Sequence, residues 1–114
     1  MKWIDIGHEK DLIEEGGVCA LINGIQIAIF RLGKPDRIFA IDNFDPKSGV
    51  HALSRGIVGS HGSHITVASP IYKHHYDLRT GICLEDHETR VNTWPVKIHQ
   101  NRILLGGHNL ENYQ

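Results

Sequence analysis

The stretch that decides the fold of this chain is Ser69-Pro70-Ile71-Tyr72-Lys73-His74-His75-Tyr76-Asp77-Leu78-Arg79-Thr80-Gly81. It follows residues 64–68, a β-branched run that is typical of a strand. Because proline cannot donate a hydrogen bond to a strand ladder, Pro70 marks the end of that strand. The pattern therefore predicts a strand that leads directly into a loop, and a second strand that leaves the loop near Asp77.

Outward from this stretch, short apolar segments alternate with turn signals, which is the pattern of an all-β domain. Residues 18–22 and 25–30 flank Asn23-Gly24, a pair that supplies the positive φ angles of a type I′ hairpin turn. Residues 38–41 follow a turn at residues 33–36, and residues 96–98 and 103–105 form a final hairpin around residues 99–102. Single helical turns are expected only at residues 9–14 and 47–53. We expect an antiparallel β-sandwich or small barrel with short helical turns.

The composition fits one globular domain of 114 residues, of which 40% are hydrophobic and 22% charged. We expect that domain at residues 1–106 and a polar C-terminal tail at residues 107–114. Twelve basic and thirteen acidic side chains give a formal net charge of -1, so neither a nucleic-acid partner nor an anionic membrane is expected. No apolar run approaches the roughly 20 residues that a membrane helix needs.

Cys19 and Cys83 both lie in apolar stretches, so we expect two reduced thiols in the core. Reduced thiols and the lack of a signal-peptide apolar region at the N-terminus predict a cytoplasmic protein. Trp3 and Trp94 are also expected to pack in the core, because tryptophan is highly buried on average.

Residues 69–81 resemble the second cluster-binding loop of Rieske iron–sulfur proteins, which reads Cys-Pro-x-His-Gly-x-x-[Phe/Tyr]-Asp-x-x-Thr-Gly. Ser69 stands at the cysteine position and Tyr72 at the histidine position. The first Rieske loop is similar to residues 39–47, where Asp45 replaces its cysteine and Lys47 its histidine. The resemblance covers about residues 3–105 and implies a Rieske-like fold.

A Rieske [2Fe–2S] centre needs two thiolates on one iron and two imidazoles on the other. Aspartate, lysine, serine and tyrosine cannot reproduce that set, because no soft sulfur donor remains and the lysine ammonium has no free lone pair. We therefore predict no cluster and no other cofactor in this chain. No catalytic residue is expected either, since the chain has no Gly-x-Ser-x-Gly motif and Cys83 has no nearby cationic activator.

One cluster-free Rieske-like family matches closely. Residues 17–21, 26–31, 53–56, 67–70 and 81–86 resemble, in order and spacing, the small subunit of bacterial NAD(P)H-dependent assimilatory nitrite reductase. The resemblance implies a large-subunit partner that carries FAD, an iron–sulfur cluster and sirohaem and reduces nitrite to ammonium. It also implies that the small subunit is required for the assembled enzyme without supplying a redox centre.

The degenerate loops then become candidates for docking on that partner, and the candidate residues are Asp45, Lys47, Tyr72, Lys73 and His74. An Asp45–Lys47 or Asp45–Lys73 ion pair could hold the two loops together in place of iron. His74 is expected to project from the end of the loops. The alternative is that the loops are a solvated remnant without a function.

Two rival functions stay open at this point. The first is an electron-carrying Rieske ferredoxin, which requires the four ligands that are missing here. The second is a small metal protein that uses some of the nine histidines, with His61, His64, His74 and His75 as candidates. Exposed imidazoles in turns are the simpler interpretation, because no cysteine or carboxylate lies at ligand spacing.

Overall fold

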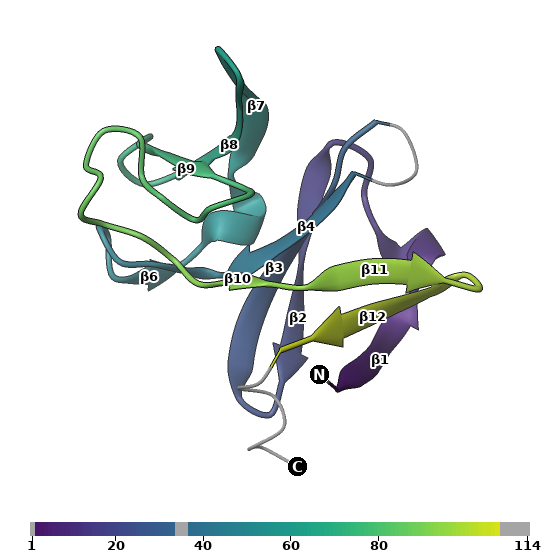
Figure 1. Ribbon diagram of the computed structural model, residues 1–114. Helices are drawn as coiled ribbons and strands as arrows, with labels where there is room; N and C mark the ends of the chain where they lie inside the picture. Colours follow the sequence, from purple (N-terminus) through teal and green to yellow (C-terminus); the bar gives the residue numbers. More distant parts are fainter. Residues whose placement is uncertain (1, 34–36, 108–114) are drawn as a thin grey trace.

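The computed structural model describes residues 2–33 and 37–107 (Figure 1). Within these residues the chain forms twelve strands and two short 3-10 helices, η1 and η2. In chain order they are β1 (Trp3–His8), η1 (Glu9–Asp11), β2 (Gly16–Ile22), β3 (Ile25–Arg31), β4 (Ile38–Asp42), β5 (Phe44–Asp45), β6 (Val50–His51), η2 (Leu53–Arg55), β7 (Ile57–His61), β8 (His64–Ala68), β9 (His75–Asp77), β10 (Thr93–Trp94), β11 (Val96–His99) and β12 (Arg102–Gly106).

The strands form two lobes (Figure 1). A larger lobe contains the sheets β1-β12-β11 and β10-β4-β3-β2, and a smaller lobe contains the sheets β5-β6 and β7-β8-β9. Every pair of neighbouring strands is antiparallel. The all-β prediction is therefore confirmed.

Strand β3 joins the two lobes because both of its faces are buried. Ile27 and Ile29 point into the core of the larger lobe, where Trp94 and Leu105 also lie. Ala28 and Phe30 point the other way, into the core that the smaller lobe closes. Successive side chains of a strand alternate between faces, so an uninterrupted apolar run is what a strand between two cores requires.

The hairpin turns agree with the sequence prediction where the structure describes them. Asn23 and Gly24 have φ angles of 51° and 85°, as a type I′ turn requires. Gln100 and Asn101 repeat this geometry, with φ of 51° and 68°, so the last hairpin turns on two residues. The turn expected at residues 33–36 lies outside the described residues except for Gly33, and so does the expected tail except for Gly107.

The helical turn expected at residues 47–53 does not span those residues: a single turn closes at residues 45–49, and η2 begins only at Leu53. The backbone N–H of Gly49 donates to the Asp45 carbonyl at 2.7 Å, which closes one tight turn. The positive φ of Gly49, 74°, then directs the chain back, and Val50 pairs with Asp45 in the β5-β6 hairpin. The helical turn expected at residues 9–14 is confirmed but is shorter, as η1.

Two residues expected in the core are exposed. Cys83 and Trp94 are buried, as predicted, but Cys19 is exposed and Trp3 is 37% exposed. Strand β1 lies at the edge of its sheet and β2 at the edge of its own. Helix η2 packs on β2 near Gly17, on the same face of the strand as Cys19. Further along β2 this face is exposed to solvent, and Cys19 lies there.

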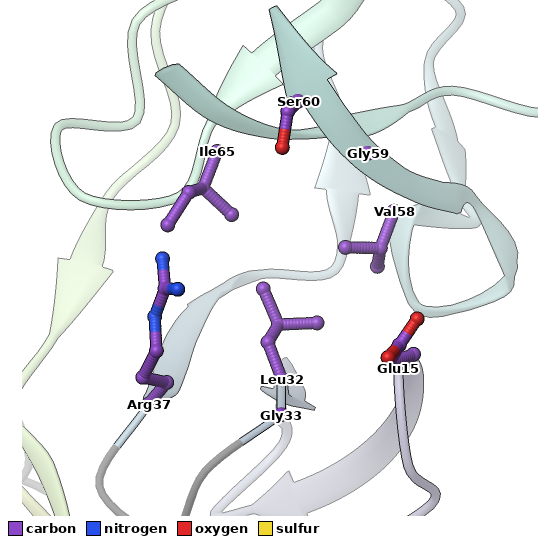
Figure 2. A pocket seen from close by; sticks show the side chains of 8 residues that line it. All are labelled: Glu15, Leu32, Gly33, Arg37, Val58, Gly59, Ser60 and Ile65. Atoms are coloured by element: carbon purple, nitrogen blue, oxygen red, sulfur yellow. The ribbon is translucent and has the colours of Figure 1, made fainter. Parts of the chain in front are cut away.

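A hollow of about 230 Å³ marks the seam between the lobes (Figure 2). Leu32 of the larger lobe faces Val58 and Ile65 of the smaller lobe across it, and Arg37 and Glu15 lie at its rim. No site residue expected from the sequence lines this hollow. No helix within the described residues has the length and apolar character to cross a membrane.

Candidate functional site

The two degenerate loops meet at the end of the smaller lobe and form what we call the tip, residues 45–49 and 69–74. The first loop is closed by the bond between Gly49 and Asp45 described above. In the second loop, the N–H of Ser69 donates to the His74 carbonyl at 2.9 Å, and the N–H of Lys73 donates to the Ser69 carbonyl at 3.0 Å. The fold thus brings all four former ligand positions into one region.

The Asp45 carboxylate is the centre of the tip and is fully buried, with 0% exposure. Its two oxygens accept hydrogen bonds from both loops and from β9. Oδ1 accepts from Lys47 N (3.0 Å), His74 Nε2 (3.0 Å) and Tyr76 OH (2.7 Å), and Oδ2 accepts from Ser48 Oγ (2.9 Å) and Ser69 Oγ (2.6 Å). A hydrogen-bonded carboxylate therefore joins the loops at the position of a former cysteine ligand.

These hydrogen bonds decide the charge state of Asp45. Burial alone raises the pKa of a carboxyl group, but the bonds from Ser69, His74, Tyr76 and Ser48 outweigh it and hold the pKa of Asp45 far below its ordinary value. Asp45 is therefore ionised. The same contact acts oppositely on Tyr76, whose pKa is raised by burial and by the hydrogen bond to Asp45.

The ion pairs predicted for Asp45 with Lys47 or Lys73 are wrong. Lys47 Nζ instead pairs with Asp86 Oδ2 at 2.6 Å, which ties the first loop to a third segment of the chain. The hydrogen bonds from Lys47 and Thr89 lower the pKa of Asp86 to about 2. The side chain that stands in the place expected for a lysine is His74, whose Nε2 lies 3.0 Å from Asp45 Oδ1.

The five docking candidates divide into two groups. Asp45 and His74, at 0% and 9% exposure, cannot offer their side chains to a partner, and the expectation that His74 projects from the tip is wrong. Tyr72 is 67% exposed, Lys73 is exposed, and Lys47 lies on the surface in its pair with Asp86. Buried residues thus support the tip, and exposed ones form its surface.

Sequence reasoning missed Ser48, Tyr76 and Asp86 as members of this site. Tyr76 had a signal, because it occupies the aromatic position of the Rieske loop motif at the start of a predicted strand. No sequence signal pointed to Ser48 or Asp86. A serine in a turn is common, and Asp86 lies 39 positions from Lys47, so only folding brings the two together.

The residues at the four former ligand positions do not fit an iron–sulfur cluster. Asp45 already accepts five hydrogen bonds, Ser69 donates its hydroxyl to Asp45, and Lys47 is engaged with Asp86. The Tyr72 side chain is exposed. Neither cysteine stands at a ligand position, and burial raises the pKa of the Cys83 thiol, which disfavours the thiolate that iron binds.

The four histidines considered as metal ligands pair with carboxylates or with one another. His64 Nδ1 lies 2.6 Å from Asp77 Oδ2, and His75 Nδ1 lies 2.6 Å from Glu85 Oε2. The ring of His61 lies against that of His75, with 4.1 Å between centroids. Among residues 2–33 and 37–107, no group of three or more His, Cys, Asp or Glu side chains is arranged to hold a metal ion.

The fold and the two loops define a Rieske-like domain. The family model described as "Rieske-like [2Fe-2S] domain" matches residues 2–106. A ferredoxin of carbazole 1,9a-dioxygenase from Nocardioides aromaticivorans shares the fold, with a TM-score of 0.76 at 18% identity over 93% of this chain and 98% of that one.

More similar relatives define a narrower group. The nitrite reductase (NADH) small subunit of Escherichia coli K12 is 38% identical over 106 residues, which are 93% of this chain and 98% of that protein. The small subunit of Salmonella typhimurium is 37% identical over the same shares. The solved structure of the E. coli protein NirD has a TM-score of 0.86 at 37% identity and covers 94% of this chain and 97% of that one. The chain belongs to the family of nitrite reductase (NADH) small subunits.

The same domain also occurs inside a longer protein. The nitrite reductase [NAD(P)H] large subunit of Klebsiella oxytoca contains a segment that is 37% identical over 108 residues, 95% of this chain but only 11% of that protein.

Proposed function

We propose that this chain is the non-redox small subunit of an NAD(P)H nitrite reductase and docks on the large subunit that reduces nitrite to ammonium. Its similarity to small subunits over 93% of its length carries this proposal. The Klebsiella protein adds support, because there a segment similar to this chain is covalently part of the large subunit.

In this assembly the chain is accessory to an oxidoreductase and holds no cofactor of its own. The FAD, sirohaem and iron–sulfur cluster belong to the large subunit. The buried contacts of Asp45 support this role, because they hold the two loops in one shape without metal and so keep the exposed residues of the tip in fixed positions. Residues 1–106 act as one docking domain, with Lys47, Tyr72 and Lys73 on its surface.

We also propose that the protein works in the cytoplasm in nitrate and nitrite assimilation. The exposed free thiol of Cys19 supports a reducing compartment, because such thiols oxidise readily outside it.

The test is to co-purify tagged chain with the large subunit and to measure nitrite-dependent NAD(P)H oxidation with and without it. We expect a stable complex and higher activity in its presence, and no nitrite-dependent oxidation by the isolated chain. Failure to bind the large subunit, or activity of the isolated chain, would overturn the proposal.

A further inference from the structure

A groove of about 540 Å³ lies beside the tip, on the outer face of the sheet β7-β8-β9. Three cross-strand neighbours contribute to it, because Ile57 pairs with Ala68 and Ala68 pairs with His75. Neighbours in register place their side chains on the same face of a sheet. The small side chain of Ala68 therefore forms a low floor between Ile57 and His75.

The walls of the groove combine apolar and cationic side chains. Arg55 at the end of η2 stands on one side, and Pro70 and Lys73 of the second loop also line it. Ile57 is 78% exposed, and the neighbouring loop residues Ile71 and Tyr72 are 43% and 67% exposed. A groove lined by an exposed apolar residue, with further exposed apolar residues in the adjoining loop, is characteristic of an interaction site.

Two cations of this groove are unmatched, although the two carboxylates Glu85 and Asp86 near the tip are engaged. Asp86 pairs with Lys47, and Glu85 pairs with His75. Partial burial raises the pKa of Glu85, but its hydrogen bonds with His75 outweigh burial and lower that pKa to about 2. The side chains of Arg55 and Lys73, in contrast, form no hydrogen bond or ion pair with the residues that the structure describes. The groove therefore presents positive charge in a chain whose formal net charge is -1.

Lys73 adds a conformational argument. Its φ angle is 61°, in the left-handed region that favours glycine and is unfavourable for a residue with a side chain. Lys73 stands at the glycine position of the Rieske loop motif, directly after the histidine position held by Tyr72, and glycine adopts such a φ without strain. The second loop therefore holds the Lys73 side chain at the wall of the groove at a conformational cost.

We infer that this groove receives an extended segment of the large subunit in which aspartate or glutamate side chains stand beside apolar ones. The acidic groups pair with Arg55 and Lys73, and an apolar side chain rests on Ala68 against Ile57. This inference rests on the proposed function and names the chemistry of the surface that the large subunit presents.

The first test compares charge reversals of equal size. Lys73→Glu should weaken binding to the purified large subunit by about three- to tenfold at low salt, with a smaller effect at high salt. Lys10→Glu, on η1 in the larger lobe, carries the same charge change and should stay within about twofold of the wild-type affinity. Equal effects of the two reversals would show that only net charge matters and would overturn the inference.

A second test uses two variants, one that fills the groove at constant charge and one that removes the Lys73 side chain. Ala68→Leu should weaken binding at least fivefold, because the longer side chain occupies the floor. Lys73→Gly should weaken binding while leaving thermal stability unchanged or higher, because glycine accepts the φ of 61°. The melting temperature of each variant checks folding, and wild-type affinity in folded Ala68→Leu would exclude the groove.

The third test identifies the occupant. A photo-crosslinking amino acid at position 57 in the small subunit of the assembled complex should label one peptide of the large subunit that contains Asp or Glu beside apolar residues. Labelling of a peptide without acidic residues, or of a second copy of this chain, would contradict the inference. If the wild-type chain does not bind the large subunit at all, the proposed function fails; if it binds and the groove variants bind equally, only the groove is wrong.

Discussion

At the scale of single residues, a carboxylate does here what iron does in a Rieske protein. A cluster ties two loops together through four coordination bonds, whereas Asp45 ties them through five hydrogen bonds from residues of both loops and of β9. Hydrogen bonds to a charged group are stronger than neutral ones, and burial removes the competition of water. One ionised side chain is therefore sufficient to fix the tip.

Replacing Asp45 by asparagine should lower the free energy of unfolding by about 2–4 kcal/mol. Asparagine keeps the size of aspartate but has only one acceptor oxygen, so donors such as Ser69 and Tyr76 lose a charged partner. Urea denaturation measures the change. Asp5→Asn is the control, since that carboxylate is exposed in its pair with Arg102 and its loss should change stability little. Equal stability of Asp45→Asn and wild type would contradict the role given to Asp45.

The same carboxylate predicts a pH dependence of stability. The pKa of Asp45 is lowered in the folded protein, so below its ordinary value of about 4 the unfolded chain binds a proton that the folded chain does not. The stabilisation is therefore fully present at neutral pH and is lost as the pH falls through the acid range. Urea midpoints measured between pH 7 and pH 3 should fall for the wild type and fall less steeply for Asp45→Asn. Parallel curves would show that other carboxylates cause the acid sensitivity.

At the scale of elements, glycines in turns are required for two different reasons. Gly24 and Gly81 have almost the same φ, 85° and 80°. A Cβ at Gly24 meets nothing within 4 Å, whereas a Cβ at Gly81 collides with the carbonyl oxygen of Val91. The Gly24 turn is thus limited only by backbone conformation, and the Gly81 turn also by its packing against the Val91 backbone, just before β10.

Gly24→Ala should therefore cost about 1 kcal/mol of unfolding free energy, the conformational penalty alone. Gly81→Ala should cost at least about 3 kcal/mol, because the backbone must also move away from Val91. Thermal denaturation of the two variants side by side measures the difference. A cost at Gly81 no larger than at Gly24 would contradict the close approach of Val91.

Elements with a strong local signal could be predicted from the sequence. The hairpins around Asn23-Gly24 and residues 99–102 depend on neighbours in the chain, so both hairpins could be predicted, and Asn23-Gly24 also indicated its type of turn. The segment 47–53 could not be predicted, because its course depends on the pairing of Val50 with Asp45 and not on helical propensity. The exposure of Cys19 could not be predicted either, because apolar neighbours in the sequence do not show which strand lies at the edge of a sheet.

At the scale of the whole molecule, the fold is that of a Rieske-like domain, and the residues at its four former ligand positions do not suit the cluster. Protein expressed with added iron, or treated with iron and sulfide, should show neither the visible absorption nor the paramagnetic signal of a [2Fe–2S] centre. Absorption spectra and electron paramagnetic resonance make the measurement, with a Rieske ferredoxin treated in parallel as the positive control. A stoichiometric cluster in this chain would restore the electron-carrier alternative.

The sequence by itself determined the all-β class, the positive φ angles of the Asn23-Gly24 turn, and the loss of all four cluster ligands, because each depends on residue types at fixed positions. Only the tertiary structure decided how the degenerate loops are used. The partners of Asp45 lie up to 31 positions away in the chain, and the pair of Lys47 with Asp86 spans 39. Contacts over such distances exist only once the sheets have formed, so the sequence could name Asp45 and Lys47 but not which of them the fold would bury.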